Sequence, residues 1–179
     1  MGGSMAERAA ISDEAIAILK VLWTQEDPSF QGRYHSFSGM KFSPKPLQKP
    51  HIPLWVGGTT PAAIRRAVNR GNGWHALPTS PDDLAPKVQY LKQQAIKAGV
   101  DLSAFPISIR LDVDPLGHVR TSAPARYNLR PRPAEVLAET GKFQRLGVTD
   151  VIYSIGTRDV DRFRDTMELL ASDVVPKLR

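Results

Sequence analysis

The sequence predicts an α/β fold in which four strand–helix units follow one another, or about half of a (β/α)8 barrel. Short apolar runs alternate with segments of helical periodicity, the signature of parallel strands joined by helices. Capping residues or prolines precede several of these helices, and Gly71, Gly99 and Gly147 stand where three of them end. A complete barrel needs about 250 residues, whereas this chain has 179.

The first third of the chain precedes these units. Residues 1–5 read as an expression leader, so we expect one α/β domain over residues 6–179. Ser12 is a good N-cap, and the apolar residues after it recur at helical spacing, which predicts a helix over residues 12–23. Residues 24–53 are rich in proline, which removes backbone donors and disfavours helix, so this segment is predicted to be a long ordered loop.

Each unit has a short apolar strand and a helix of mixed polarity. The predicted strands are residues 54–56, 74–77, 107–113 and 150–154, and the predicted helices are residues 61–70, 81–98, 134–146 and 159–171. Two architectures accommodate this order: a segment of a barrel and an open, flavodoxin-like sheet. Helices on one face of the sheet would favour the barrel segment, and helices on both faces would favour the open sheet.

The composition excludes several classes of site and partner. The chain has no cysteine, which excludes disulfides, thiolate metal sites and cysteine nucleophiles. It has no apolar run long enough to span a bilayer and no visible signal peptide, so we expect a cytoplasmic protein with no membrane partner. The net charge is +6, but no nucleic-acid-binding motif is present and we expect no nucleic-acid partner.

The strongest local signal is a glycine-rich turn between the first strand and its helix. Gly57 and Gly58 allow a close approach of backbone to ligand, and Thr59 and Thr60 bring hydroxyl groups. Pro61 then occupies the first helical position. Free N–H groups at such a helix start attract phosphate. The alternative interpretation is a tight turn with a threonine N-cap and no ligand.

Other residues are weaker candidates. Trp74 is expected in the core. His75 follows it and either faces the barrel mouth or has a structural role. Asp112 and Asp114 point the same way from a strand end, but one carboxylate pair does not make a metal site. Arg110, inside a strand, suggests an inward-facing role. The loop over residues 114–133 brings basic side chains suited to a cofactor phosphate or to solvent: His118, Arg120, Arg126, Arg130 and Arg132.

Residues 53–64, followed by Gly71-Asn72-Gly73-Trp74, resemble the luciferase-like monooxygenase family of flavin- and deazaflavin-dependent barrel oxidoreductases. Asn72 stands where the family pattern has aspartate. Further segments stand upstream in the family's order: Asp13-Glu14-Ala15-Ile16, Leu22-Trp23-Thr24, Phe30-Gln31-Gly32-Arg33-Tyr34 and Pro44-Lys45-Pro46-Leu47-Gln48.

The resemblance implies that the chain corresponds to the fifth to eighth units of such a barrel. It implies that the cofactor is F-420 or FMN, and that its phosphate binds through the turn. The implied cofactor-binding residues are Gly57, Gly58, Thr59, Thr60, Gly73 and Trp74. No catalytic residue carries over, because the family's ring-contacting residues come largely from the first half of the barrel.

The implied activity is that of an oxidoreductase or monooxygenase acting on a small molecule. A half barrel has open sheet edges and an exposed inner face, which recruit partners. We therefore expect a homodimer or an association with a missing N-terminal half. The alternative is a non-catalytic flavin-phosphate-binding module, or an inactive half barrel that dimerises.

Overall fold

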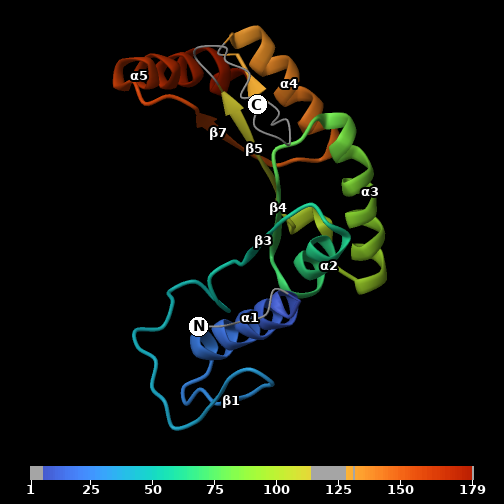
Figure 1. Ribbon diagram of the computed structural model, residues 1–179, viewed down its shortest axis with the longest axis vertical. Helices are drawn as coiled ribbons and strands as arrows, with labels where there is room; N and C mark the ends of the chain where they lie inside the picture. The colour runs from blue at the N-terminus through green and yellow to red at the C-terminus, as the bar shows by residue number, and fades with distance from the viewer. Residues whose placement is uncertain (1–5, 114–127, 131, 179) are drawn as a thin grey trace. The chain divides into compact units, whose positions relative to one another are not determined.

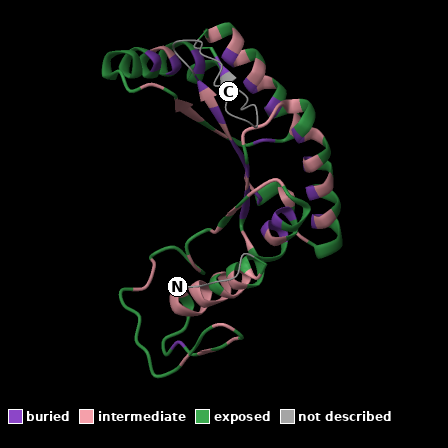
Figure 2. Ribbon diagram, viewed as in Figure 1, coloured by how far each residue is buried: buried purple, intermediate pink, exposed green. Residues whose placement is uncertain are grey.

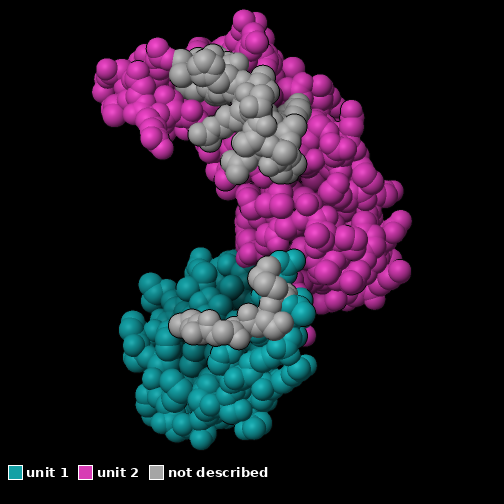
Figure 3. Space-filling view, viewed as in Figure 1, with its two compact units in different colours: residues 1–54 teal, residues 55–179 magenta. Residues whose placement is uncertain are grey.

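The computed structural model describes residues 6–113, 128–130 and 132–178. By its internal contacts the chain divides into two compact units, Met1–Leu54 and Trp55–Arg179 (Figure 3). The two units are described separately below. The first contains one long helix with a hairpin, and the second contains all the predicted strand–helix units.

The first unit begins with helix α1 (Arg8–Thr24), which starts about one turn before the predicted residue. Ser12 is therefore not its N-cap. The Ser12 hydroxyl donates to the carbonyl of Arg8 at 2.7 Å, inside the helix, and Glu7 stands at the N-cap without a side-chain hydrogen bond. The extra turn, from Arg8 to Ile11, contains residues that favour helix, chiefly alanine, so the helix extends past the capping serine.

The segment predicted as a loop contains a short hairpin. Strand β1 (Phe30–Gln31) pairs antiparallel with β2 (Ser36–Phe37), and Phe30 lies opposite Phe37. Their rings stack with centroids 6.1 Å apart. Strands of two residues have no readable period of alternation, so the prediction of an ordered loop did not include this hairpin.

The second unit follows the predicted order of strands and helices closely. Its strands are β3 (Trp55–Gly57), β4 (Gly73–Ala76), β5 (Ile107–Val113), β6 (Asn128–Leu129) and β7 (Asp150–Ile155). Its helices are α2 (Pro61–Arg70), α3 (Pro81–Ala98), α4 (Pro133–Leu146) and α5 (Val160–Leu169). Side chains of Thr60, Ser80 and Asp159 cap α2, α3 and α5, each accepting a backbone N–H of the first turn.

All pairings in this sheet are parallel, as predicted. The sheet runs from β3 through β4 to β5, and both β6 and β7 pair with β5. The short strand β6 lies within the segment predicted as a loop, so that part of the prediction was wrong. Among the described strands, β3 ends the sheet on one side and β7 borders it on the other.

The helices cover one face of this sheet. Helices α2, α3 and α4 lie along the same side of β3, β4 and β5, and the buried residues gather between them (Figures 1 and 2). The strand residues on this face are apolar and buried: Trp74, Ala76, Ile107, Ile109, Leu111 and Val113. No described helix of the second unit covers the opposite face, where Trp55 is 41% and Ile152 is 51% exposed. This arrangement confirms the barrel segment rather than the open, doubly covered sheet.

Candidate functional site

The turn between β3 and α2 depends on glycine at one position. Gly58 has φ +118°, a conformation that residues with a side chain rarely adopt. A Cβ atom at Gly58 would also lie 3.0 Å from the Cβ of Ala63. At Gly57, by contrast, an added Cβ would meet no atom within 4 Å. Gly58 therefore shapes the turn, whereas Gly57 leaves open space beside it.

Several backbone donors at this turn have no acceptor within the described part of the chain. The N–H of Gly58 is already used, since it donates to the carbonyl of His75 at 3.0 Å. The N–H of Ala63 donates to the hydroxyl of Thr60 at 3.2 Å. The N–H groups of Thr59, Thr60 and Ala62 make no hydrogen bond to any described residue. Three donors at a helix N-terminus form an arrangement that suits an anion.

Trp74 and Gly73 stabilise this turn from the neighbouring strand. The Trp74 side chain is fully buried on the helix-covered face, as the sequence predicted, and its Nε1–H donates to the carbonyl of Gly58 at 2.6 Å. A Cβ at Gly73 would lie 3.1 Å from the ring of Trp55, so glycine there makes room for that indole. Both residues therefore support the turn through backbone contacts and packing. The Trp74 ring is buried and has no surface exposed to a ligand.

A row of residues crosses the open face beside the turn. The strand register pairs Gly57 with His75, and His75 with Ser108. The Nδ1 atom of His75 lies 2.7 Å from the Ser108 hydroxyl. Burial lowers the pKa of the His75 imidazole below its ordinary value, and the positive charge of Arg110 lowers it further. His75 is therefore a neutral, half-buried side chain on the predicted face.

Arg110 and Asp112 continue the polar face of β5. The Nε atom of Arg110 is buried and lies 3.2 Å from Asp112 Oδ1, at an angle that makes no good hydrogen bond. The inward-facing position predicted for Arg110 is thus confirmed. Sequence reasoning missed Ser108, although polar residues at every second position of β5 signal a strand with one polar face.

The predicted carboxylate pair and basic loop fall partly outside the described residues. Asp114, His118, Arg120 and Arg126 lie in the part that the structure does not describe, while Arg130 and Arg132 are exposed. Within residues 6–113, 128–130 and 132–178, no group of three or more histidine or acidic side chains is placed to hold a metal ion. No helix in the same ranges is long and apolar enough to cross a membrane.

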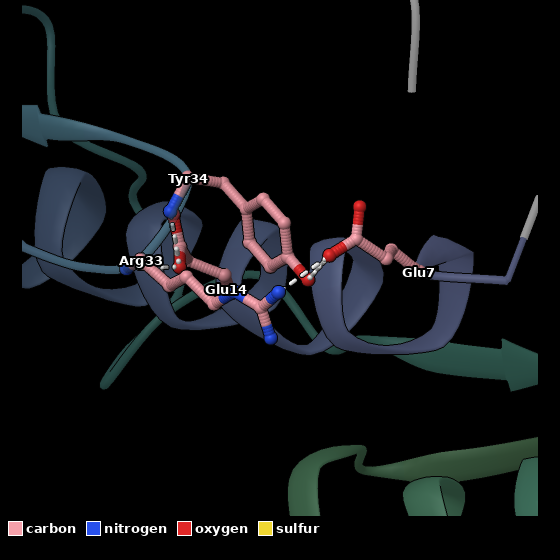
Figure 4. Close-up of polar contacts among 4 residues, drawn as sticks. All are labelled: Glu7, Glu14, Arg33 and Tyr34. Atoms are coloured by element: carbon pink, nitrogen blue, oxygen red, sulfur yellow. Dashed lines mark hydrogen bonds and ion pairs between the residues drawn. The ribbon is translucent and has the colours of Figure 1, made fainter. Parts of the chain in front are cut away.

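Two of the upstream segments that carry the resemblance, residues 13–16 and 30–34, form a carboxylate clamp inside the first unit. The carboxylate of Glu14, on α1, accepts the backbone N–H groups of Arg33 and Tyr34 at 2.8–3.1 Å (Figure 4). It also accepts the backbone N–H of His35 at 2.6 Å. A Cβ at Gly32 would lie 2.5 Å from Glu14 Cδ, so this approach requires glycine. The clamp fixes the bend of the hairpin on α1, which gives these residues a structural role.

A second carboxylate on α1 supports the same bend. Glu7 Oε1 lies 2.6 Å from Arg33 Nη2 and accepts the Tyr34 hydroxyl at 3.2 Å. Burial alone raises the pKa of the Glu14 carboxyl, but the donors from Tyr34, His35 and Arg33 outweigh it and hold that pKa below the ordinary value. The clamp is therefore ionised at neutral pH.

Comparison with known proteins identifies the family of this chain. A family model described as luciferase-like monooxygenase matches residues 1–130. The chain is 35% identical over 109 residues to the FMNH(2)-dependent dimethylsulfone monooxygenase of Pseudomonas putida, covering 57% of this chain and 29% of that protein. It is 29% identical over 149 residues to the F420-dependent glucose-6-phosphate dehydrogenase of Gordonia bronchialis, covering 78% and 43%.

A solved structure shares the fold over the whole chain. An F420-dependent secondary alcohol dehydrogenase, in complex with an F420–acetone adduct, matches with a TM-score of 0.80 and 18% identity, covering 100% of this chain and 64% of that one. At this identity the likeness shows the fold alone. The chain spans less than half the length of the two curated relatives named above.

Proposed function

The chain belongs to the luciferase-like monooxygenase family, and on that premise we propose that its turn at residues 57–60 binds the phosphate of FMN or coenzyme F-420. The two curated relatives named above support this pair of cofactors, since one is named as FMNH(2)-dependent and the other as F420-dependent. Both cofactors carry a phosphate group, so one anion site serves either of them.

The observation that carries the proposal is the set of open donors at the start of α2. The N–H groups of Thr59, Thr60 and Ala62 have no acceptor among the described residues, and the dipole of α2 adds positive potential there. A phosphate accepts several hydrogen bonds at once, so the donor set fits the group. Gly58 provides the backbone conformation of the turn, and Gly57 leaves the space through which a ligand comes close to these donors.

When bound, a flavin or deazaflavin supplies hydride transfer, and a flavin also supplies monooxygenation. This chain's own part is to anchor the phosphate and to form one wall of the site with the open face of its sheet. We propose an oxidoreductase of this family acting on a small molecule. The alternative is a non-catalytic module that binds the cofactor phosphate without turnover.

A fluorescence titration of the purified chain with FMN and with F-420 tests the phosphate site. Gly57→Asp places a carboxylate beside the donors without a steric clash, since nothing lies within 4 Å of an added Cβ. Gly57→Asn is its matched neutral control. We expect Gly57→Asp to weaken binding by at least about tenfold through charge repulsion, and Gly57→Asn to weaken it much less.

Riboflavin, which lacks the phosphate, separates anchoring from ring contacts. We expect it to bind more weakly than FMN and to be insensitive to Gly57→Asp. Equal binding of FMN by both variants and the unsubstituted chain would contradict the phosphate site. Turnover of the bound cofactor with a reductant and a panel of small substrates then separates the enzyme from the non-catalytic module.

We also propose that the open face of the sheet is covered by a partner, either a second copy or an N-terminal half barrel. Three large apolar side chains support this: Trp55, Leu77 and Ile152 are each between 41% and 52% exposed. Strands β3 and β7 also offer unpaired edges among the described strands. Sedimentation velocity over a range of concentrations tests the second copy, and a strictly monomeric chain at high concentration would count against it.

A further inference from the structure

The hydroxyl of Ser108 determines which ring nitrogen of His75 carries the proton. The Ser108 side chain is fully buried, and its only hydrogen-bond partner among the described residues is Nδ1 of His75, at 2.7 Å. A buried hydroxyl left without an acceptor is unfavourable, because it has given up its hydrogen bonds to water. The favoured arrangement therefore has the Ser108 O–H donating to Nδ1. Because the imidazole is neutral, its own proton must then lie on Nε2.

Arg110 lies diagonally beside this imidazole on the next strand. His75 pairs in register with Ser108, and Arg110 follows two residues later on the same face of β5, toward the carboxyl end. Its side chain is 37% exposed, and its terminal nitrogens make no hydrogen bond or ion pair with any described residue. Asp112 Oδ1 lies 3.2 Å from Nε as an ion pair without a good hydrogen bond, and the two Nη groups are left available.

We propose that His75 and Arg110 together form a binding site for a carboxylate on the open face of the sheet, between β4 and β5. The Nη groups of Arg110 match the two oxygens of a carboxylate, and the Nε2–H of His75 supplies a third donor. Gly57, next to His75 in register, leaves open space on this face. The ligand class is a small organic acid.

Among the residues that the structure describes, two acidic side chains of the strands share this face and do not close the site. Asp112 is engaged by Arg110 Nε, as described above. Asp150 pairs in register with Ser108 from β7, so it lies on the far side of β5 from His75, and its carboxylate accepts the Thr149 hydroxyl at 2.6 Å. The site borders the phosphate turn at Gly57, but its donors, on His75 and Arg110, are not those of the turn, so the proposal stands whether or not FMN or F-420 binds there.

Nuclear magnetic resonance of the ¹⁵N-labelled full chain tests both steps. Long-range ¹H–¹⁵N spectra distinguish the two histidine tautomers, and His75→Asn identifies the His75 signals. We expect the Nε2–H tautomer in the unsubstituted chain and a mixture of tautomers in Ser108→Ala. A predominant Nδ1–H tautomer in the unsubstituted chain would overturn the donor role of His75.

Acetate is the ligand probe, and acetamide at matched ionic strength is its neutral control. We expect a saturable shift of the His75 signals with acetate alone, and Arg110→Met weakens it by about tenfold or more. Arg164→Met is the control variant, because Arg164 pairs with Asp161 at the same 3.2 Å spacing but lies on α5. Equal responses to acetate and acetamide, or an acetate affinity unchanged by Arg110→Met, would overturn the proposal. Arg110→Lys keeps the positive charge but lacks the paired Nη groups. It replaces Arg110→Met in this test if that variant does not fold.

Discussion

Trp74→Phe is the most informative single perturbation of the turn. The indole is fully buried, and its Nε1–H donates to the Gly58 carbonyl at 2.6 Å. Phenylalanine keeps an aromatic ring in the core but removes that donor. The variant therefore separates the polar anchor of the turn from the apolar packing around it, and Trp55→Phe, at a 41% exposed indole on the open face, is the matched control.

The expected loss of stability has two parts. Leaving the Gly58 carbonyl without its partner costs about 1–3 kcal/mol. The smaller ring leaves a cavity, and since removal of a whole buried tryptophan side chain costs about 3–5 kcal/mol, this lesser truncation adds roughly 1 kcal/mol. The free energy of unfolding is thus expected to fall by about 2–4 kcal/mol. Trp55→Phe is expected to change it by less than about 1 kcal/mol.

Urea unfolding followed by far-ultraviolet circular dichroism measures this difference without relying on tryptophan fluorescence. With a urea dependence of about 2 kcal/mol per molar, the middle of the usual range, the midpoint of Trp74→Phe is expected to fall by roughly 1–2 M. Cofactor titration of the folded variant is expected to show weaker binding, because the turn loses its anchor. A midpoint equal to that of Trp55→Phe, with unchanged cofactor affinity, would refute the role assigned to this hydrogen bond.

Three further predictions follow from single contacts. Thr60→Ala removes the α2 cap and is expected to lower the free energy of unfolding by about 1 kcal/mol in urea titrations, whereas Thr60→Ser is expected to retain it. Gly32→Ala forces a Cβ against Glu14, so hydrogen exchange at residues 33–35 is expected to accelerate; unchanged protection there would count against the clamp. Because the folded pKa of His75 lies below its ordinary 6.5, its stabilising contribution is present above pH 6.5 and is lost as the pH falls through the folded pKa. Arg110→Met is expected to raise that pKa partway in a magnetic resonance titration, and an unmoved pKa would contradict the charge effect.

Local signals explain why much of the second unit could be predicted from the sequence. Helices α2 and α3 have the predicted bounds, because proline at the first helical position follows the capping residues Thr60 and Ser80. Strand β5 also has its predicted bounds, because its apolar residues alternate over seven positions. These signals lie within a few residues of the elements that they define.

The wrong or incomplete predictions arise where a stronger local preference or a contact with a distant element decides the structure. Ser12 has the chemistry of a cap, yet helix formers upstream extend α1 past it. The β1–β2 hairpin forms because Glu14, on a different element, satisfies the N–H groups at its bend. Strand β6 exists only because β5 offers it an edge at Asp112 and Val113.

Residue types at short spacing were enough to predict the order of strands and helices, their parallel pairing, the glycine-rich turn and the family resemblance. Which donors of the turn are open depends on long-range contacts, because the N–H of Gly58 is used by a carbonyl on the next strand. It alone placed His75 beside Ser108 and Arg110, since strand register sets which side chains share a face. A register is a property of two strands together, so one strand's residues do not encode it.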